Sequence, residues 1–138
     1  MKKNFAVVTV LLSLLFLFGM GELGGSPPSE KIPLPEKNFS VLVVDREGIQ
    51  TSLSQFSYEG KVFLSGRRGS ATVAIPFDKI LEVQFQGQEG TEKLARVSLK
   101  DQKIVEIKLD KRSKVFGRAE FGTFQVEVKD LKSIRFHP

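Results

Sequence analysis

The sequence predicts an all-β protein, a small antiparallel β-sandwich or closed barrel of about eight to ten short strands. Apolar and polar residues alternate with a period of two in many short runs, and these runs do not repeat apolar residues at helical spacing. In addition, one strand-like stretch occurs twice, at residues 72–85 and 123–136. Short alternating strands in two similar halves are typical of a sandwich or a barrel.

The doubled stretch aligns with itself at an offset of 51 positions, so that Thr72 coincides with Thr123. Each copy interrupts its alternation at an adjacent aspartate and lysine, which predicts a core strand, a tight corner and a second strand. We therefore predict an internal repeat formed by residues 39–86 and 94–136. A few short strands cannot bury an apolar face alone, so the two halves are expected to share one core.

The bulk composition is that of a single folded domain. Of the 138 residues, 41% are hydrophobic and 27% are charged, which argues against general disorder. The formal net charge of +5 is a mild excess that does not require a nucleic-acid partner. Cysteine is absent, which excludes disulfides, a thiol nucleophile, zinc–thiolate sites and an acylated cysteine anchor.

The N-terminus has the features of a secretory signal peptide. Two lysines precede an almost wholly apolar run at residues 5–18, and small residues follow it. We predict a signal segment at residues 1–21, cleaved after Gly21; the alternative is an uncleaved membrane anchor, because glycines stand where alanines are usual. Residues 22–38 form a linker rich in proline, glycine and serine, which favours an extended spacer.

The β-domain at residues 39–138 is predicted from short apolar runs separated by turn residues. Pro76 lies inside the first copy of the repeat and confines that position to an edge or a corner of the sheet. The strongest hairpin signal joins residues 95–100 to residues 105–110. In chain order we predict strands at 40–44, 49–56 and 61–65, a turn at 66–69, the first copy, a loop at 86–93, the hairpin, a basic strand at 111–117 and the second copy.

Groups suited to catalysis or metal binding are scarce. His137 is the single histidine and stands beside the C-terminus, where a general base is poorly held, so we expect a solvated strand end. The acidic residues of the predicted loops are expected to be solvated rather than to bind calcium. We therefore predict that the protein is not an enzyme and has no cofactor or metal site.

The best candidate surface is basic. If the repeat holds, Arg67 and Arg118 occupy equivalent places, and one rim of the fold would be positive and able to bind an anionic lipid head group or a polyanionic glycan. We favour the alternative that these charges protect edge strands from aggregation. The candidate residues are Arg67, Arg68, Lys111, Arg112, Lys114 and Arg118.

These observations predict an exported, non-enzymatic envelope module, periplasmic or extracellular, that binds another envelope protein or has a structural role. If the N-terminal segment is retained, the module would instead be tethered to the membrane. The alternative function is binding of an anionic ligand by the basic rim. Nucleic acid is not an expected partner, because no aromatic ladder accompanies the basic residues.

Overall fold

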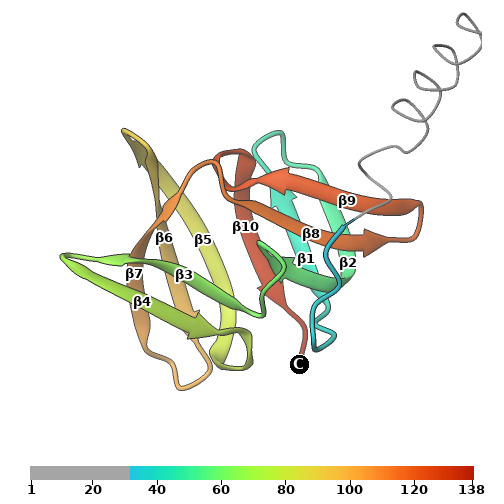
Figure 1. The fold of residues 1–138 in the computed structure, drawn as a ribbon, viewed down its shortest axis with the longest axis horizontal. Coiled ribbons are helices and arrows are strands. Elements are labelled where there is room, and N and C mark those ends of the chain that lie inside the picture. Colours follow the sequence, from blue (N-terminus) through green and yellow to red (C-terminus); the bar gives the residue numbers. More distant parts are fainter. Residues whose placement is uncertain (1–31) are drawn as a thin grey trace, which may run out of the picture. The chain divides into compact units, whose positions relative to one another are not determined.

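The computed structural model describes residues 32–138, which contain ten β-strands and two short 3-10 helices, η2 and η3 (Figure 1). The predicted signal segment and most of the predicted linker lie outside the described residues. In chain order the elements are β1 (Val41–Asp45), β2 (Gln50–Tyr58), β3 (Phe63–Arg68), β4 (Ala71–Pro76), η2 (Phe77–Lys79), β5 (Ile80–Glu89), β6 (Glu92–Leu99), β7 (Ile104–Asp110), β8 (Lys114–Ala119), β9 (Gly122–Glu127), η3 (Val128–Asp130) and β10 (Leu131–Phe136).

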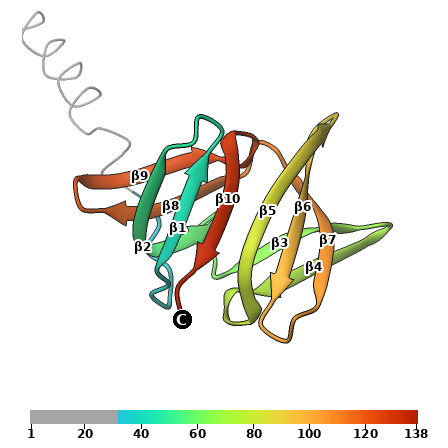
Figure 2. The same ribbon diagram turned by 180° about the vertical axis from the view of Figure 1, so that it is seen from behind.

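The ten strands form one continuous antiparallel sheet that curls into an open half-barrel (Figures 1 and 2). Its strand order is β4-β3-β7-β6-β5-β10-β1-β2-β8-β9, so β4 and β9 are edge strands. The all-β, antiparallel prediction is confirmed, but neither the closed barrel nor the two-sheet sandwich is formed. A two-sheet sandwich is absent because all ten strands belong to one sheet, and the barrel is open because the edge strands β4 and β9 do not pair with each other.

The strand order follows the same plan from either edge. Inward from β4 it is β4, β3, β7, β6 and β5; inward from β9 it is β9, β8, β2, β1 and β10. The β3–β4 hairpin thus pairs with β7, and the β8–β9 hairpin pairs with β2. As a result, β3 to β7 form a continuous inner unit that is inserted between β2 and β8 of a discontinuous outer unit.

The pairing registers of the two units correspond residue by residue. Val41 pairs with Leu53 in the outer unit, and Ala95 pairs with Ile107 in the inner unit, at an offset of 54. All four side chains are buried. From β3 and β8 onward the offset is 51, which also relates η2 to η3. The tight corners predicted at the charged pairs are these two 3-10 helices.

A glycine in each of the two hairpins lets the neighbouring strand approach closely. A Cβ at Gly66 would lie 2.7 Å from the carbonyl oxygen of Lys108, and a Cβ at Gly117 would lie 2.9 Å from the Cβ of Leu53. Such distances are too short for ordinary packing. The docking of β3 on β7 and of β8 on β2 therefore requires glycine at both positions.

Three local predictions need correction. The turn predicted at 66–69 is largely part of β3. The loop predicted at 86–93 is mostly strand, because β5 and β6 continue to a tight turn at Gly90, whose φ of 59° suits glycine. The basic strand predicted at 111–117 begins only with β8, after a turn.

One hydrophobic core extends through both units. It consists of alternate strand residues and of the buried residue of each 3-10 helix, Phe77 and Val128. Four phenylalanine rings form an aromatic cluster, in which the Phe77 centroid lies 5.0 Å from that of Phe136 and 5.4 Å from those of Phe39 and Phe56. These offset and edge-on contacts stabilise the core beyond simple area burial, which fits a phenylalanine-rich, tryptophan-free sequence.

The end of the predicted linker lies against the domain. Ile32 is buried, and the Lys37 ammonium forms an ion pair with the Asp78 carboxylate at 2.8 Å. Within residues 32–138, no helix has the length and apolar character needed to cross a membrane.

Candidate functional site

The structure separates the six basic residues that the sequence suggested as one rim. Six strands lie between β3 and β8 in the sheet, and their hairpins extend to opposite sides of the domain (Figures 1 and 2). Arg67 and Arg68 lie near the tip of the β3–β4 hairpin, Lys111 and Arg112 lie in the β7–β8 connection, and Lys114 and Arg118 lie at the two ends of β8.

Arg67 is engaged within the inner unit. Its guanidinium donates two hydrogen bonds to the Glu92 carboxylate, at 2.7 Å from Nε and 2.6 Å from Nη2. These bonds lower the pKa of Glu92 below its ordinary value. The pair is exposed, so its charges are largely satisfied by each other and by solvent.

The β7–β8 connection uses its backbone to hold the fold together. The Lys111 N–H donates to the carbonyl oxygen of Thr91, while the Lys111 carbonyl accepts a hydrogen bond from the N–H of Lys129. The Lys114 N–H donates to the carboxylate of Glu59. These contacts fix the β7–β8 connection to the β5–β6 turn, to η3 and to the β2–β3 turn. The position of the connection is therefore explained by its structural role.

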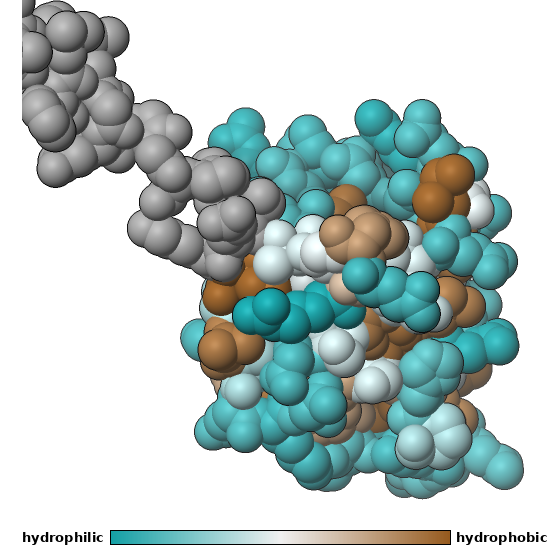
Figure 3. Space-filling view, turned by 90° about the vertical axis from the view of Figure 1, so that its right-hand side faces the viewer, coloured by the Kyte–Doolittle hydropathy of each residue, from teal (hydrophilic) through white to brown (hydrophobic). Residues whose placement is uncertain are grey.

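Arg118 lines a groove at the β8–β9 side of the domain. We call it the Arg118 groove; it has a volume of about 350 Å³ and is lined by Ser40, Ser52, Leu53, Ser54, Arg118, Ala119, Glu120 and His137. A second hollow of about 240 Å³ shares Ser52, Ala119 and Glu120 with it and reaches Phe121, at the tip of the β8–β9 hairpin. Figure 3 shows this end of the domain, where apolar surface lies in separate patches among hydrophilic residues.

Arg118 differs from its register equivalent Arg67 in having no carboxylate partner. Within residues 32–138 its guanidinium forms no ion pair. The residue equivalent to Glu92 at the offset of 54 is Asn38, whose side-chain oxygen accepts a hydrogen bond from the N–H of Gln55 at 2.8 Å. The groove is therefore lined by an exposed arginine that has no ion-pair partner among the described residues.

His137 lies in the wall of the same groove. Its backbone N–H donates to the carbonyl oxygen of Ser40, which fixes the chain after β10. In the described part of the chain, no hydrogen bond joins the imidazole to Ser52 or Ser54, so the groove does not present a nucleophile paired with a base.

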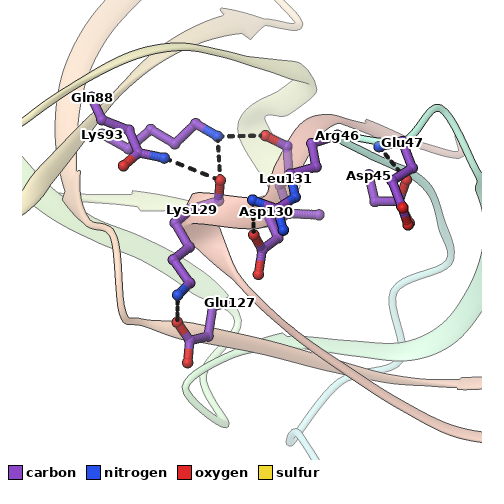
Figure 4. Close-up of polar contacts among 9 residues, drawn as sticks. All are labelled: Asp45, Arg46, Glu47, Gln88, Lys93, Glu127, Lys129, Asp130 and Leu131. Atoms are coloured by element: carbon purple, nitrogen blue, oxygen red, sulfur yellow. Dashed lines mark hydrogen bonds and ion pairs between the residues drawn. The ribbon is translucent and has the colours of Figure 1, made fainter.

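A buried lysine is the second unusual polar feature (Figure 4). Lys93 is only 7% exposed, and its Nζ donates to the carbonyl oxygens of Lys129 and Leu131 at 2.9 and 2.8 Å. The ammonium also lies 5.7 Å from the centroid of the Phe85 ring. Burial lowers the pKa of Lys93, and the nearby Asp130 carboxylate partly offsets this effect.

The surroundings of Lys93 are structural. Gln88 donates to the same Lys129 carbonyl at 3.2 Å, so two side chains of the β5–β6 hairpin hold the C-terminal carbonyls of η3. Arg46 lies 3.2 Å from Asp130 Oδ1 as an ion pair, although that oxygen accepts no hydrogen bond. The ammonium thus anchors η3 to the inner unit, and it does not face either groove.

The sequence analysis missed both Lys93 and the Arg118 groove. Lys93 could have been found, because it continues the inward alternation of Ala95 and Val97 by one step of two residues. The groove could not, because Ser40, Ser52 and the β8–β9 tip come from distant parts of the chain. Within the described residues, no group of three histidines, cysteines or carboxylates is arranged to hold a metal ion.

Comparison with known proteins places the chain in a family. A family model described as "Uncharacterised protein" matches residues 35–138. The chain belongs to that family. It is also similar to an "Uncharacterized protein" of Aquifex aeolicus (strain VF5), with 25% identity over 130 residues that cover 94% of each chain. No solved structure matches.

Proposed function

We propose that the protein is an exported, non-enzymatic module of the cell envelope that binds another protein by accepting an extended strand along β4. The observation that supports this most is the character of β4 itself. It is an edge strand, and its sequence Ala-Thr-Val-Ala-Ile-Pro contains no charged residue. Uncharged edges invite pairing with further strands, and most proteins protect them with charges.

The geometry of β4 suits strand addition. Every second residue of an outer antiparallel strand turns its N–H and C=O groups toward solvent, and a partner strand can bind these groups. Thr72, Ala74 and Pro76 are exposed, while Val73 and Ile75 face the core and are half-buried. Pro76 removes one donor at the end of the strand, which limits the docking length to the residues before it.

The other edge of the sheet is better protected. β9 carries Gln125 and Glu127, and the Glu127 carboxylate is 3.5 Å from the ammonium of Lys129. The arginines that the sequence suggested as edge protection, Arg67 and Arg118, lie one strand inside the edges, on β3 and β8. β4 therefore has no charge of its own, although its position is equivalent to that of β9.

The expected occupant is a short extended segment of another envelope protein, with an acidic residue at one end. Arg68 pairs in register with Ala71 at the turn end of the β3–β4 hairpin. Arg68 is exposed, and among residues 32–138 it has no ion-pair partner. A carboxylate beside it would fix the register of the incoming strand.

Crosslinking of the full chain in the envelope fraction tests this proposal. Ala74 and Gln125 are exposed and occupy equivalent places at the offset of 51, so Ala74→Lys and Gln125→Lys place the same charge on the two edges. We expect one stoichiometric partner in the wild type and in Gln125→Lys, and loss of that partner in Ala74→Lys.

Equal recovery of the partner by both variants would contradict the proposal, provided that circular dichroism shows both to be folded. If the crosslinked species is instead a dimer of this chain that is lost in Ala74→Lys, the strand that binds β4 comes from a second copy and not from another protein. Recovery of the monomer alone would remove the function altogether.

Export is part of the same proposal and rests on the basic start and apolar run of residues 1–21. Fractionation followed by N-terminal sequencing separates the two forms that the sequence allows. We expect a mature protein that begins after Gly21. An intact Met1 on membrane-bound protein would instead support the tethered form.

We also infer that the domain arose by duplication of a five-stranded unit. The strand order, the two registers and the pair Gly66 and Gly117 support this inference. Other members of the family should keep glycine at both positions, since both hairpins need the same close approach. An aligned set of relatives with bulky residues at either position would count against it.

The second candidate function is binding of an anionic ligand. The six basic residues do not share a rim, so this function cannot rest on all of them. It is favoured by one observation, namely that Arg118 lies unpaired beside a groove whereas its equivalent Arg67 is paired.

A further inference from the structure

We propose that the Arg118 groove binds the carboxylate of a small organic acid that also carries an apolar group. This proposal narrows the second candidate function to one site and one ligand class. It does not depend on strand addition at β4, which lies at the opposite edge of the sheet. The two proposals can therefore fail separately.

The main argument is the guanidinium of Arg118. A planar guanidinium with parallel N–H donors matches the geometry of a carboxylate. Arg67, at the equivalent place, already makes this contact with Glu92, which shows that the scaffold can present an arginine in that way. At Arg118 the residue that corresponds to Glu92 is Asn38, whose side-chain oxygen accepts a hydrogen bond from the Gln55 N–H. The guanidinium N–H groups of Arg118 therefore remain available to a ligand.

The walls of the groove supply further polar groups. Ser40, Ser52 and His137 line it together with Arg118. Hydroxyl and imidazole groups can donate hydrogen bonds to the second oxygen of a bound carboxylate. The volume of about 350 Å³ falls at the lower end of the range usual for small-ligand sites, so the ligand is expected to be small.

Glu120 decides between classes of anion. It lines both hollows and, like Arg118, has no ion-pair partner among residues 32–138. One cation and one anion in the same wall leave the groove close to neutral. Glu120 therefore disfavours a doubly charged phosphate more than a singly charged carboxylate.

Phe121 is the reason to expect an apolar group on the ligand. Its side chain is 79% exposed at the tip of the β8–β9 hairpin and lines the hollow that continues the groove. Small-ligand sites commonly combine apolar or aromatic side chains with a few polar groups. A ligand with a carboxylate at Arg118 and an apolar group near Phe121 would use both.

NMR titration of the full chain tests the proposal. The probes are N-acetylphenylalanine, its uncharged amide and inorganic phosphate, and the signals are the Arg118 Nε–H and the backbone amides of Ser52 and Ala119. We expect saturable shifts with N-acetylphenylalanine, with a dissociation constant of about 1–10 mM, and no saturation with the amide. Arg118→Gln should weaken binding by roughly tenfold or more, because it removes a charge-assisted hydrogen bond.

Arg67→Gln is the matched control, since it changes the equivalent arginine on the other hairpin. It should leave the titration unchanged, and so should Ala74→Lys. The proposal is overturned if the amide binds as well as the acid, if phosphate binds more tightly than the acid, or if Arg118→Gln leaves the shifts intact. Absence of any saturable shift at Arg118 would also overturn it.

Discussion

The two units of the sheet hold their 3-10 helices in place with different side chains, aromatic rings at η2 and a buried lysine at η3. In the aromatic cluster, the η2 residue Phe77 packs against Phe39, Phe56 and Phe136. The equivalents of Phe77, Phe39 and Phe136 are Val128, Lys93 and Phe85. Leu109 corresponds to Phe56, because it pairs with Lys93 as Phe56 pairs with Phe39. We call these four equivalents the lysine cluster. The largest difference is at Phe39, because its equivalent Lys93 places a charged group in the same layer.

This difference shows which structural feature the two units share. Both clusters hold a 3-10 helix of one unit against the other unit, either by ring packing or by hydrogen bonds from Lys93 to the carbonyls of Lys129 and Leu131. The backbone corner is common to both, whereas the side chains that anchor it are not. A buried ammonium is tolerated because backbone carbonyls satisfy it.

The largest expected effect comes from the aromatic cluster. Phe77→Ala removes a fully buried ring with three aromatic neighbours and should lower the free energy of unfolding by about 3–5 kcal/mol. Val128→Ala, at the equivalent place, removes only two carbons and should cost about 2 kcal/mol. Urea denaturation compares them directly. Equal losses would mean that the rings add nothing specific to the corner.

Lys93→Met tests the other anchor. The substitution keeps the apolar stem but leaves a buried carbonyl of Leu131 without its side-chain donor, so we expect a loss of about 1–3 kcal/mol. Lys132→Met, at an exposed position of the adjacent β10, is the control and should change little. If the two variants have the same stability, the ammonium is not an anchor.

The lowered pKa of Lys93 also predicts how stability depends on pH. The unfolded chain binds this proton more tightly than the folded chain does, so folding must oppose protonation of Lys93. Its contribution to stability should therefore rise as the pH increases from the lowered folded-state pKa toward the ordinary value of about 10.4. Comparison of urea midpoints for the wild type and Lys93→Met over this range isolates the effect. A contribution that falls with pH would contradict the assignment.

Gly66 in the β3–β4 hairpin and Gly117 in the β8–β9 hairpin test whether the two units pack in the same way. Gly66→Ala and Gly117→Ala should each lower stability by about 1–3 kcal/mol, because the new methyl group would force a neighbouring strand away. The effect at Gly66 should be larger, since its Cβ would meet a backbone oxygen. Gly87→Ala has open space around its Cβ and is the control. Thermal unfolding of all three gives the comparison.

The smallest effect is expected at the exposed pair of Arg67 and Glu92. Arg67→Gln should reduce stability only slightly, and the difference should shrink as salt is added. Arg118→Gln, which breaks no ion pair, should not show this salt dependence. Thermal unfolding at two ionic strengths distinguishes the two arginines, and identical behaviour would contradict the contrast between them.

Much of this fold could be predicted from local patterns. Alternation identified most of the strands. The corners predicted at the charged pairs Asp78-Lys79 and Lys129-Asp130 lie within η2 and η3. The order of the strands could not be predicted, because alternation shows which face is buried but not which strand lies beside it. The pairing of β3 with β7 and of β8 with β2 depends on the close approaches at Gly66 and Gly117. The sequence indicated a turn at Gly66 and the end of a strand at Gly117.

The candidate site was less predictable than the fold. Arg118 was identified, but its five companions lie elsewhere, because equivalent positions in the two halves are carried to opposite sides of the sheet. What distinguishes Arg118 from Arg67 is one residue, Asn38 in place of Glu92, in a segment that the sequence indicated as linker. The uncharged edge at β4 was visible in the sequence, but its position at an edge was indicated only by Pro76.

The central claim is that the two edges of the sheet differ in function despite their equivalent positions. Hydrogen exchange of the complex isolated from the envelope fraction tests it most directly. We expect the amides of β4 before Pro76 to become protected relative to the free protein, while those of β9 (Gly122–Glu127) exchange as before. Unchanged exchange at β4, or protection confined to β9, would contradict it.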